Sequence, residues 1–539
     1  MSAKTVQIPL NAAEFAFTYK ASGRQVAEPT DLAPRMPSAF YGNVANAEFG
    51  VPQLLYCENV LPMAAGLYSV GYGTQITAYT GPVTDFDQAM TLRDANENLF
   101  TFSPGGGKNY VLNSTSGAWT SVGAFTFTNY LVTHAYVNGR TFICYEKTKI
   151  IEYNAGTGLF TTLSLTLPAG VTIANIRGIF GSSNYLLFFT DITVYWSTPA
   201  NVLDFATVDQ GAGQQTPLDV KGQITCGLPC AGGFIVYTAR NAVGATFTNN
   251  GNSPFVFKEV ANAGGVPSWE RVTASADGNS GHYAFTSAGL QKLNLSGADT
   301  LYPEATDFLV GNQYERWNQT TKLVDTFPVG GAFSVKLAFL ANRFLIISYG
   351  TSRNEFEDAL VLDTSLERWG KLRVNHVDCF LYAYPTLASS YDYSQLPGLY
   401  SDMSEDSYAD LDSTRLQVTP AKRGIAFLKS NGQVDILATD FAQTSTSGLA
   451  IFGRIEQNRQ RMTTLTNVEL DGLRSGNVYS LPSEKGKNRD SSRLLPQVDV
   501  ADDYVKCDEY FTARNFDIAV EGTFMLSNLQ ARVRNHGYR

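Results

Sequence analysis

The stretch Arg140-Thr-Phe-Ile-Cys-Tyr145, followed after a short turn by Ile150-Ile-Glu-Tyr153, decides the fold of this chain. Both runs are rich in β-branched and aromatic residues, which favour strands, and turn residues separate them. The same order of turn, run, turn and run recurs along the chain. The other copies begin at Asn98, Tyr185, Gly233, His282, Arg343 and Gly424.

The spacing of these copies is typical of β-propeller blades. The first five copies follow one another at roughly 40–50 residues, the period of blades that carry several short strands. The last two separations are longer, which indicates insertions. Tandem sandwich domains would instead repeat at about 100 residues. The copies share a pattern but no WD dipeptide and no kelch double glycine. We therefore predict an all-β fold with a β-propeller of six or seven blades.

The regions on either side of the repeats differ in character and predict three parts of the chain. Residues 1–55, interrupted by Pro29, Pro34, Pro37 and Pro52 among others, are expected to form an N-terminal arm that follows a surface. Residues 56–445 are expected to form the propeller, with an acidic insertion at about 388–414. Residues 446–539 alternate as β-structure and are expected to pack on the propeller and on neighbouring subunits.

Composition and charge exclude several classes of protein. The chain has 539 residues, of which 44% are hydrophobic, so it has ample material for a core and is not intrinsically disordered. A net charge of −9 gives no general affinity for nucleic-acid phosphates or anionic membranes. The N-terminus lacks the pattern of a signal peptide, and no apolar run approaches the length of a membrane-spanning helix. We therefore expect synthesis in the cytoplasm and no membrane-spanning segment.

No motif predicts a catalytic, cofactor-binding or metal-binding residue. The six cysteines are interpreted as reduced core residues, and the four histidines lack the close spacing of metal ligands. The glycines before Lys108 lack the spacing of a phosphate-binding loop. Some five-bladed propellers are glycosidases that use paired carboxylates. The candidates here would be Glu146, Glu152 and Asp191, but the sequence gives no separation between them.

Two regions resemble the tail nozzle (tail tube, or DNA-stabilisation) proteins of short-tailed bacteriophages. One runs from Pro52 to Tyr72 and the other from Arg514 to Leu529, with the ending Asn535-His-Gly-Tyr-Arg539. In that family an Asn-Val, Pro, Gly-Gly, Gly-Tyr opening precedes a propeller, but here Ala65 stands where a second glycine is usual. The resemblance implies a virion protein without catalysis and without a cofactor. It would form a hexameric ring at the distal end of the tail, which retains the packaged genome and conducts it during ejection.

The resemblance also implies partners and gives two charged segments a possible role. The partners would be further copies of the chain, adaptor or portal-side tail proteins, tail fibres, and genomic DNA that passes without sequence-specific binding. Residues 388–414 hold six carboxylates and no basic residue. They predict either a solvated outer loop or a lumen or gate lined by Asp402, Glu405, Asp406, Asp410 and Asp412. Arg454, Arg459 and Arg461 predict either a strand edge or a subunit contact. The alternative function is a host-surface binding or polysaccharide-degrading propeller protein.

Overall fold

The computed structural model describes residues 4–8 and most of 53–535. The gaps in the second range are 64–65, 77–85, 94–98, 104–107, 114–117, 125–130, 155–156, 249, 252, 275–280, 311–312, 329–332, 385–421, 439–446, 456–462, 484–490, 502–503 and 514. Within the described residues, no helix is both long enough and apolar enough to cross a membrane.

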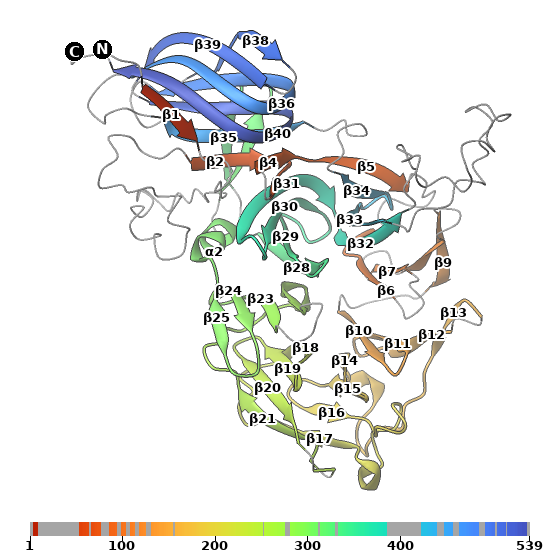
Figure 1. Ribbon diagram of the computed structural model, residues 1–539. Coiled ribbons are helices and arrows are strands. Elements are labelled where there is room, and N and C mark those ends of the chain that lie inside the picture. Colours follow the sequence, from red (N-terminus) through yellow and green to blue (C-terminus); the bar gives the residue numbers. More distant parts are fainter. Residues whose placement is uncertain are drawn as a thin grey trace, which may run out of the picture.

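Five four-stranded antiparallel sheets follow one another along the first part of the chain (Figure 1). The first two sheets are β6 (Met90–Arg93), β7 (Leu99–Ser103), β8 (Lys108–Asn113) and β9 (Ala118–Ala124), then β10 (Val132–Val137), β11 (Arg140–Tyr145), β12 (Lys149–Asn154) and β13 (Leu159–Thr162). The third is β14 (Gly178–Ser182), β15 (Tyr185–Phe189), β16 (Val194–Trp196) and β17 (Gly213–Gln215). The fourth and fifth are β18 (Ile224–Cys230), β19 (Gly233–Thr238), β20 (Ala242–Phe247) and β21 (Phe255–Glu259), then β22 (Val272–Ala274), β23 (His282–Thr286), β24 (Gly289–Leu293) and β25 (Ala298–Thr300).

Two further sets of strands complete the ring. The meander β28 (Ser334–Leu340), β29 (Phe344–Gly350), β30 (Phe356–Asp363) and β31 (Arg368–His376) has the form of a blade and continues into a larger sheet. The sixth separate four-stranded sheet consists of β32 (Asp378–Tyr384), β33 (Lys422–Leu428), β34 (Val434–Ala438) and β5 (Gly71–Ile76). The first strands of neighbouring blades are in contact from β10 through β14, β18, β22, β28 and β32 to β6.

The prediction of an all-β propeller with six or seven blades is confirmed. Each predicted pair of runs forms the second and third strands of a blade, as β11 and β12 do. The larger separation after His282 has a structural cause. Along the chain, helix α2 (Pro303–Val310) and the hairpin of β26 (Gln313–Asn318) and β27 (Leu323–Pro328) are inserted between the last strand of one blade and the first strand of the next. The predicted acidic insertion lies outside the described residues.

Hydrophobic side chains from facing blades form the cores of the ring. Phe142 and Ile150 of one blade share a cluster with Ile179 and Phe188 of the next. Burial of each such side chain contributes about 1.5–3 kcal/mol. A four-stranded sheet cannot cover both of its faces, so the blades stabilise one another only when they are stacked.

The C-terminal residues form a second β unit. Its two longest strands, β36 (Thr463–Ser483) and β40 (Asn515–Asn535), pair along their whole lengths. Gly476 and Gly522 face each other at positive φ, and a Cβ on either would lie 2.1 Å from a backbone oxygen of the other strand. The remaining strands of the unit are β1 (Lys4–Ile8), β2 (Gln53–Glu58), β35 (Gly448–Ile455), β37 (Arg493–Leu494), β38 (Gln497–Ala501) and β39 (Tyr504–Ala513).

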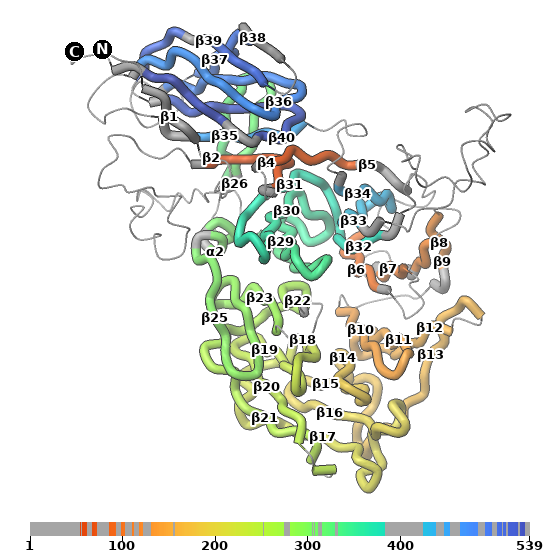
Figure 2. Tube along the Cα trace, viewed as in Figure 1, coloured from red at the N-terminus to blue at the C-terminus, as the bar shows by residue number. Residues whose placement is uncertain are grey.

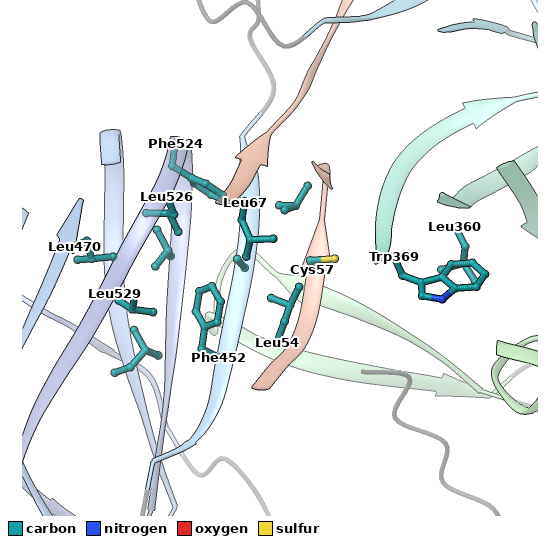
Figure 3. Packing of buried hydrophobic residues seen from close by; sticks show 14 of the residues in the cluster. Leu54, Cys57, Leu67, Leu360, Trp369, Phe452, Leu470, Phe524, Leu526 and Leu529 are labelled. Atoms are coloured by element: carbon teal, nitrogen blue, oxygen red, sulfur yellow. The ribbon is translucent and has the colours of Figure 1, made fainter. Parts of the chain in front are cut away.

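The N-terminal strands run from this second unit into the propeller. Strand β2 pairs with β35, while β3 (Val60–Met63) and β4 (Gly66–Ser69) join β31 to β40. Leu54 and Cys57 of β2 share a buried cluster with Phe452 of β35 and Leu526 of β40 (Figure 3). The tube drawing shows these red and orange strands beside the blue C-terminal strands (Figure 2). The predicted boundary at residue 56 therefore falls within β2, and residues 4–8 of the predicted arm form β1.

We predict that Gly181→Ala destabilises the ring by about 1–3 kcal/mol. Gly181 lies on β14, and a Cβ there would be 2.6 Å from the backbone oxygen of Tyr136 on β10 and 2.7 Å from Val137 Cγ2. The two strands would have to move apart, and urea denaturation measures the resulting loss. Gly251→Ala is the matched control, because a Cβ at Gly251 has no neighbour within 4 Å. Equal effects of the two substitutions would contradict the close approach of the blades.

Candidate functional site

A cluster of charged residues around the buried Glu58, Asp358 and Lys371 lies where the propeller meets the C-terminal unit. We call it the junction cluster; its members are Tyr56, Glu58, Arg316, Glu357, Asp358, Lys371 and Arg373. They come from four parts of the fold: strand β2, the hairpin β26–β27, and strands β30 and β31 of one blade. The cluster contains three carboxylates and three cations, so it is formally neutral.

Asp358 is the centre of the junction cluster. It is 1% exposed, and Nη1 of Arg316 donates to both of its carboxylate oxygens. Nη2 of Arg316 donates to Glu357 Oε2 at 3.0 Å, and Lys371 Nζ lies 3.9 Å from Asp358 Oδ2. Burial opposes the charge on Arg316, but the attraction of Asp358 outweighs it and raises the pKa of Arg316 above its usual value.

Glu58 connects the N-terminal strand to the same cluster. The Tyr56 hydroxyl donates to Glu58 Oε1, and the backbone N–H of Trp317 donates to the same oxygen at 3.2 Å. Arg373 Nη1 donates to Glu58 Oε2 at 3.1 Å. Burial, followed by the charge of Glu58, raises the pKa of Tyr56 well above its usual value. The hydroxyl therefore remains protonated and holds the carboxylate in place.

A second buried ion pair lies at the inner strands of the ring. Lys336 Nζ of β28 is 2.7 Å from Asp378 Oδ1 of β32, and both side chains are buried. Lys336 also donates to the Ala89 carbonyl at 2.8 Å, and Thr91 N of β6 donates to Asp378 Oδ2 at 2.5 Å. This pair connects three neighbouring blades where the ring closes.

The two buried groups have the chemistry of structural contacts. In the junction cluster, the carboxylates of Glu58, Glu357 and Asp358 each accept from a cation, as described above. In the described part of the chain, no group of three or more His, Cys, Asp or Glu residues could hold a metal ion. The junction cluster therefore fixes how the two β units meet.

The three carboxylates that the sequence offered for glycoside hydrolysis do not form an open pair. Glu152 accepts from Arg140 at 2.6 and 2.7 Å, and Glu146 accepts from Arg177 at 2.8 Å. Asp191 Oδ1 accepts from the Gln223 amide at 2.7 Å. Each carboxylate is thus held by a neighbouring side chain.

The residues predicted for the lumen and for the subunit contact fall largely outside the described residues. This is true of Asp402, Glu405, Asp406, Asp410, Asp412, Arg459 and Arg461. Arg454 lies on β35 of the C-terminal unit. The position of the acidic residues at the lumen or gate stays a prediction, and so does the subunit contact at the three arginines.

The junction cluster itself was missed by the sequence analysis. Its signal was the presence of charged residues inside apolar strands, such as Lys371 between Gly370 and Leu372, and Glu357-Asp358 before Ala-Leu-Val. Charges in such runs need buried partners. The partners here lie far away in the sequence or in other sheets, so no local pattern identifies them.

No protein-family model matches the sequence, and no curated protein matches it. Among solved structures, the selenomethionine form of virginiamycin B lyase from Staphylococcus aureus is 11% identical, covers 68% of this chain and 99% of its own, and has a TM-score of 0.36. A catalytically inactive form of that lyase with quinupristin is 12% identical, with 56% and 99% coverage and a TM-score of 0.32. A protein assigned as a gluconolactonase is 10% identical, with 52% and 90% coverage and a TM-score of 0.31.

The comparison corrects one expectation. The sequence analysis concluded that this chain is not an enzyme, but the similar solved structures are those of a lyase and an assigned lactonase. The prediction that this chain is not an enzyme, which was based on its fold and motifs, is therefore wrong. At these identities the likeness concerns the fold alone and assigns no reaction.

We predict that Asp358→Ala lowers the free energy of unfolding by about 3–5 kcal/mol, because it leaves Lys371 buried without its counter-charge and leaves Arg316 with Glu357 alone. Lys221→Ala is the matched control, since it breaks an ion pair with Glu259 in which the lysine is 58% exposed. The loss of unfolding free energy in Lys221→Ala should stay below about 1 kcal/mol. Urea denaturation measures both values. A loss for Asp358→Ala as small as that of the control would refute the assigned role of the junction cluster.

A second prediction concerns pH and the two buried histidines. His282 Nε2 donates to the Pro229 carbonyl at 2.8 Å and Nδ1 accepts from Tyr237 at 2.7 Å. His376 Nδ1 donates to Val374 O and Nε2 accepts from Ser348, both at 2.7 Å. Each ring is satisfied as the neutral form, and burial lowers the pKa of both to about 4. An unfolded histidine has a pKa of about 6.5. The contribution of each buried neutral histidine to the free energy of unfolding is therefore complete above that pH and is lost as the pH falls through 4.

Between pH 7 and pH 5, each histidine is expected to lower the free energy of unfolding by about 2 kcal/mol. Urea denaturation at the two pH values measures it. In His282→Gln the difference between the two pH values should fall by roughly half. An unchanged difference in that variant would show that other groups cause the pH dependence.

Proposed function

We propose that this chain is the tail nozzle subunit of a short-tailed bacteriophage, where it forms a hexameric ring that retains the packaged genome and conducts it during ejection. The main support is the position of the two segments that resemble this family. They lie toward opposite ends of the sequence, yet they belong to one sheet. Leu67 of β4 is opposite Leu526 of β40, and Tyr68 is opposite Met525.

Strand β2 adds a second connection between the same two segments. Tyr56 pairs with Ile451 of β35, and Ile451 pairs with Ala519 of β40. The two resembling segments thus pair within one sheet, directly at β4–β40 and through β35 at β2. A shared family motif would be expected to have this property.

The C-terminal unit is the part of the chain best suited to contact other subunits. A closed ring of blades offers no inner edges for further pairing, whereas the C-terminal unit ends, among the described strands, at β1, β2, β37 and β38. Arg454 lies in this unit on β35. We therefore assign the subunit contact to the C-terminal unit, including Arg459 and Arg461. The adaptor or portal-side proteins and the tail fibres would bind the assembled ring in the virion tail.

The charge of the chain fits a conduit for duplex DNA. Contacts from lysine or arginine to phosphates would add affinity and slow the passage of DNA, and the chain instead has a net charge of −9. We assign the stretch with Asp402, Glu405, Asp406, Asp410 and Asp412 to the lumen or its gate. Its repulsion of the duplex would act over about 8 Å at physiological salt.

The decisive experiment measures the chain in purified virions of the phage that encodes it. We expect six copies per particle by quantitative mass spectrometry against a coat-protein standard. The recombinant ring should have six times the 58.8 kDa mass of one chain. Absence from the particles, together with sugar release from host capsule by the purified chain, would replace the proposal with the polysaccharide-degrading alternative. Absence with host-cell binding alone would favour a receptor-binding propeller.

A further inference from the structure

The first described strand, β1, completes one edge of the C-terminal unit. Its five residues pair antiparallel with β40, from Lys4 opposite Val533 to Ile8 opposite Leu529. On its other side the same part of β40 pairs with β36, where Val533 is opposite Leu465. Among the described strands, β1 is therefore the last on this side of the sheet (Figure 1).

The edge that β1 covers needs a strand. Leu529, Ala531 and Val533 of β40 are completely buried and belong to the largest hydrophobic cluster. Without β1, the N–H and C=O groups of this apolar strand would be open to pairing with any other strand. Strand β1 therefore covers an edge that would otherwise be open to pairing with another strand.

The chain does not require that β1 comes from the same copy. Residues 9–52 separate β1 from β2. A segment of that length spans up to about 145 Å when extended, and the entropic cost of closing a loop rises slowly with its length. The pairing of β1 with β40 uses main-chain hydrogen bonds, which are the same whichever copy supplies the strand.

We propose that β1 is exchanged between neighbouring copies, so that each subunit receives its last strand from one neighbour and gives its own to the next. Such a head-to-tail interface closes into a ring when the rotation between the copies permits it. The partner that this edge fits is thus a second copy of this chain. The inference rests on the proposed function only for the number of copies in the ring.

Cysteine cross-linking tests the exchange in the full-length protein. Gln7 and Gln530 are directly opposite in the strand pair, and the variant Gln7→Cys/Gln530→Cys is oxidised and examined on a non-reducing gel. Exchange predicts a ladder of linked chains that begins at twice the 58.8 kDa mass of one chain. Co-expressed single variants, Gln7→Cys and Gln530→Cys with different tags, should give the same dimer containing both tags. The unsubstituted protein is the control, since five of its six cysteines are buried.

The other outcomes each overturn the exchange. A link within one chain of an assembled hexamer would show that β1 stays with its own copy and would leave the nozzle proposal intact. A link within a monomer would remove the exchange, while the count of copies in virions would still decide the function. No link of either kind would show that β1 and β40 do not pair in this register.

Discussion

The ion pair between Arg316 and Asp358 determines how the two β units are joined. Asp358 belongs to a propeller blade and is 1% exposed, while Arg316 belongs to a hairpin that is outside the ring sheets. A buried charge without its partner costs several kcal/mol. The hairpin must therefore lie against the blade, and its other side then packs Trp317 against Tyr479 of β36. This charge pair thus acts together with the hydrophobic cluster that Leu360 and Trp369 share with Leu526 in holding the C-terminal unit against the blade.

Residues 53–76 connect the same parts through the backbone. Strand β2 belongs to the C-terminal unit, β3 and β4 join it to the blade that contains Asp358, and β5 supplies the last strand of another blade. Closing the propeller and attaching the second unit are thus coupled, because one short stretch of chain takes part in both. The red and orange strands between the units in Figure 2 show this path.

The blades could be predicted because their strongest signal is local. The second strand of each blade is largely buried, so a run such as the one around Phe142 contains few polar residues. The pairing of β5 with β34 could not be predicted, since the two strands are far apart in the sequence and no local pattern specifies the partner. The junction cluster was missed for the same physical reason. Its charges are satisfied by residues from other strands and sheets, as Glu58 is by Arg373.

The distribution of charge limits where any electrostatic function can lie. Residues 388–414 contain six carboxylates and no basic residue, so they account for −6 of the net charge of −9. The rest of the chain is close to neutral, and several of its buried charges are paired, as Lys336 is with Asp378. Paired charges produce only a weak field at a distance because their contributions cancel. If this protein repels or guides a charged polymer through its net charge, that acidic stretch makes the largest single contribution.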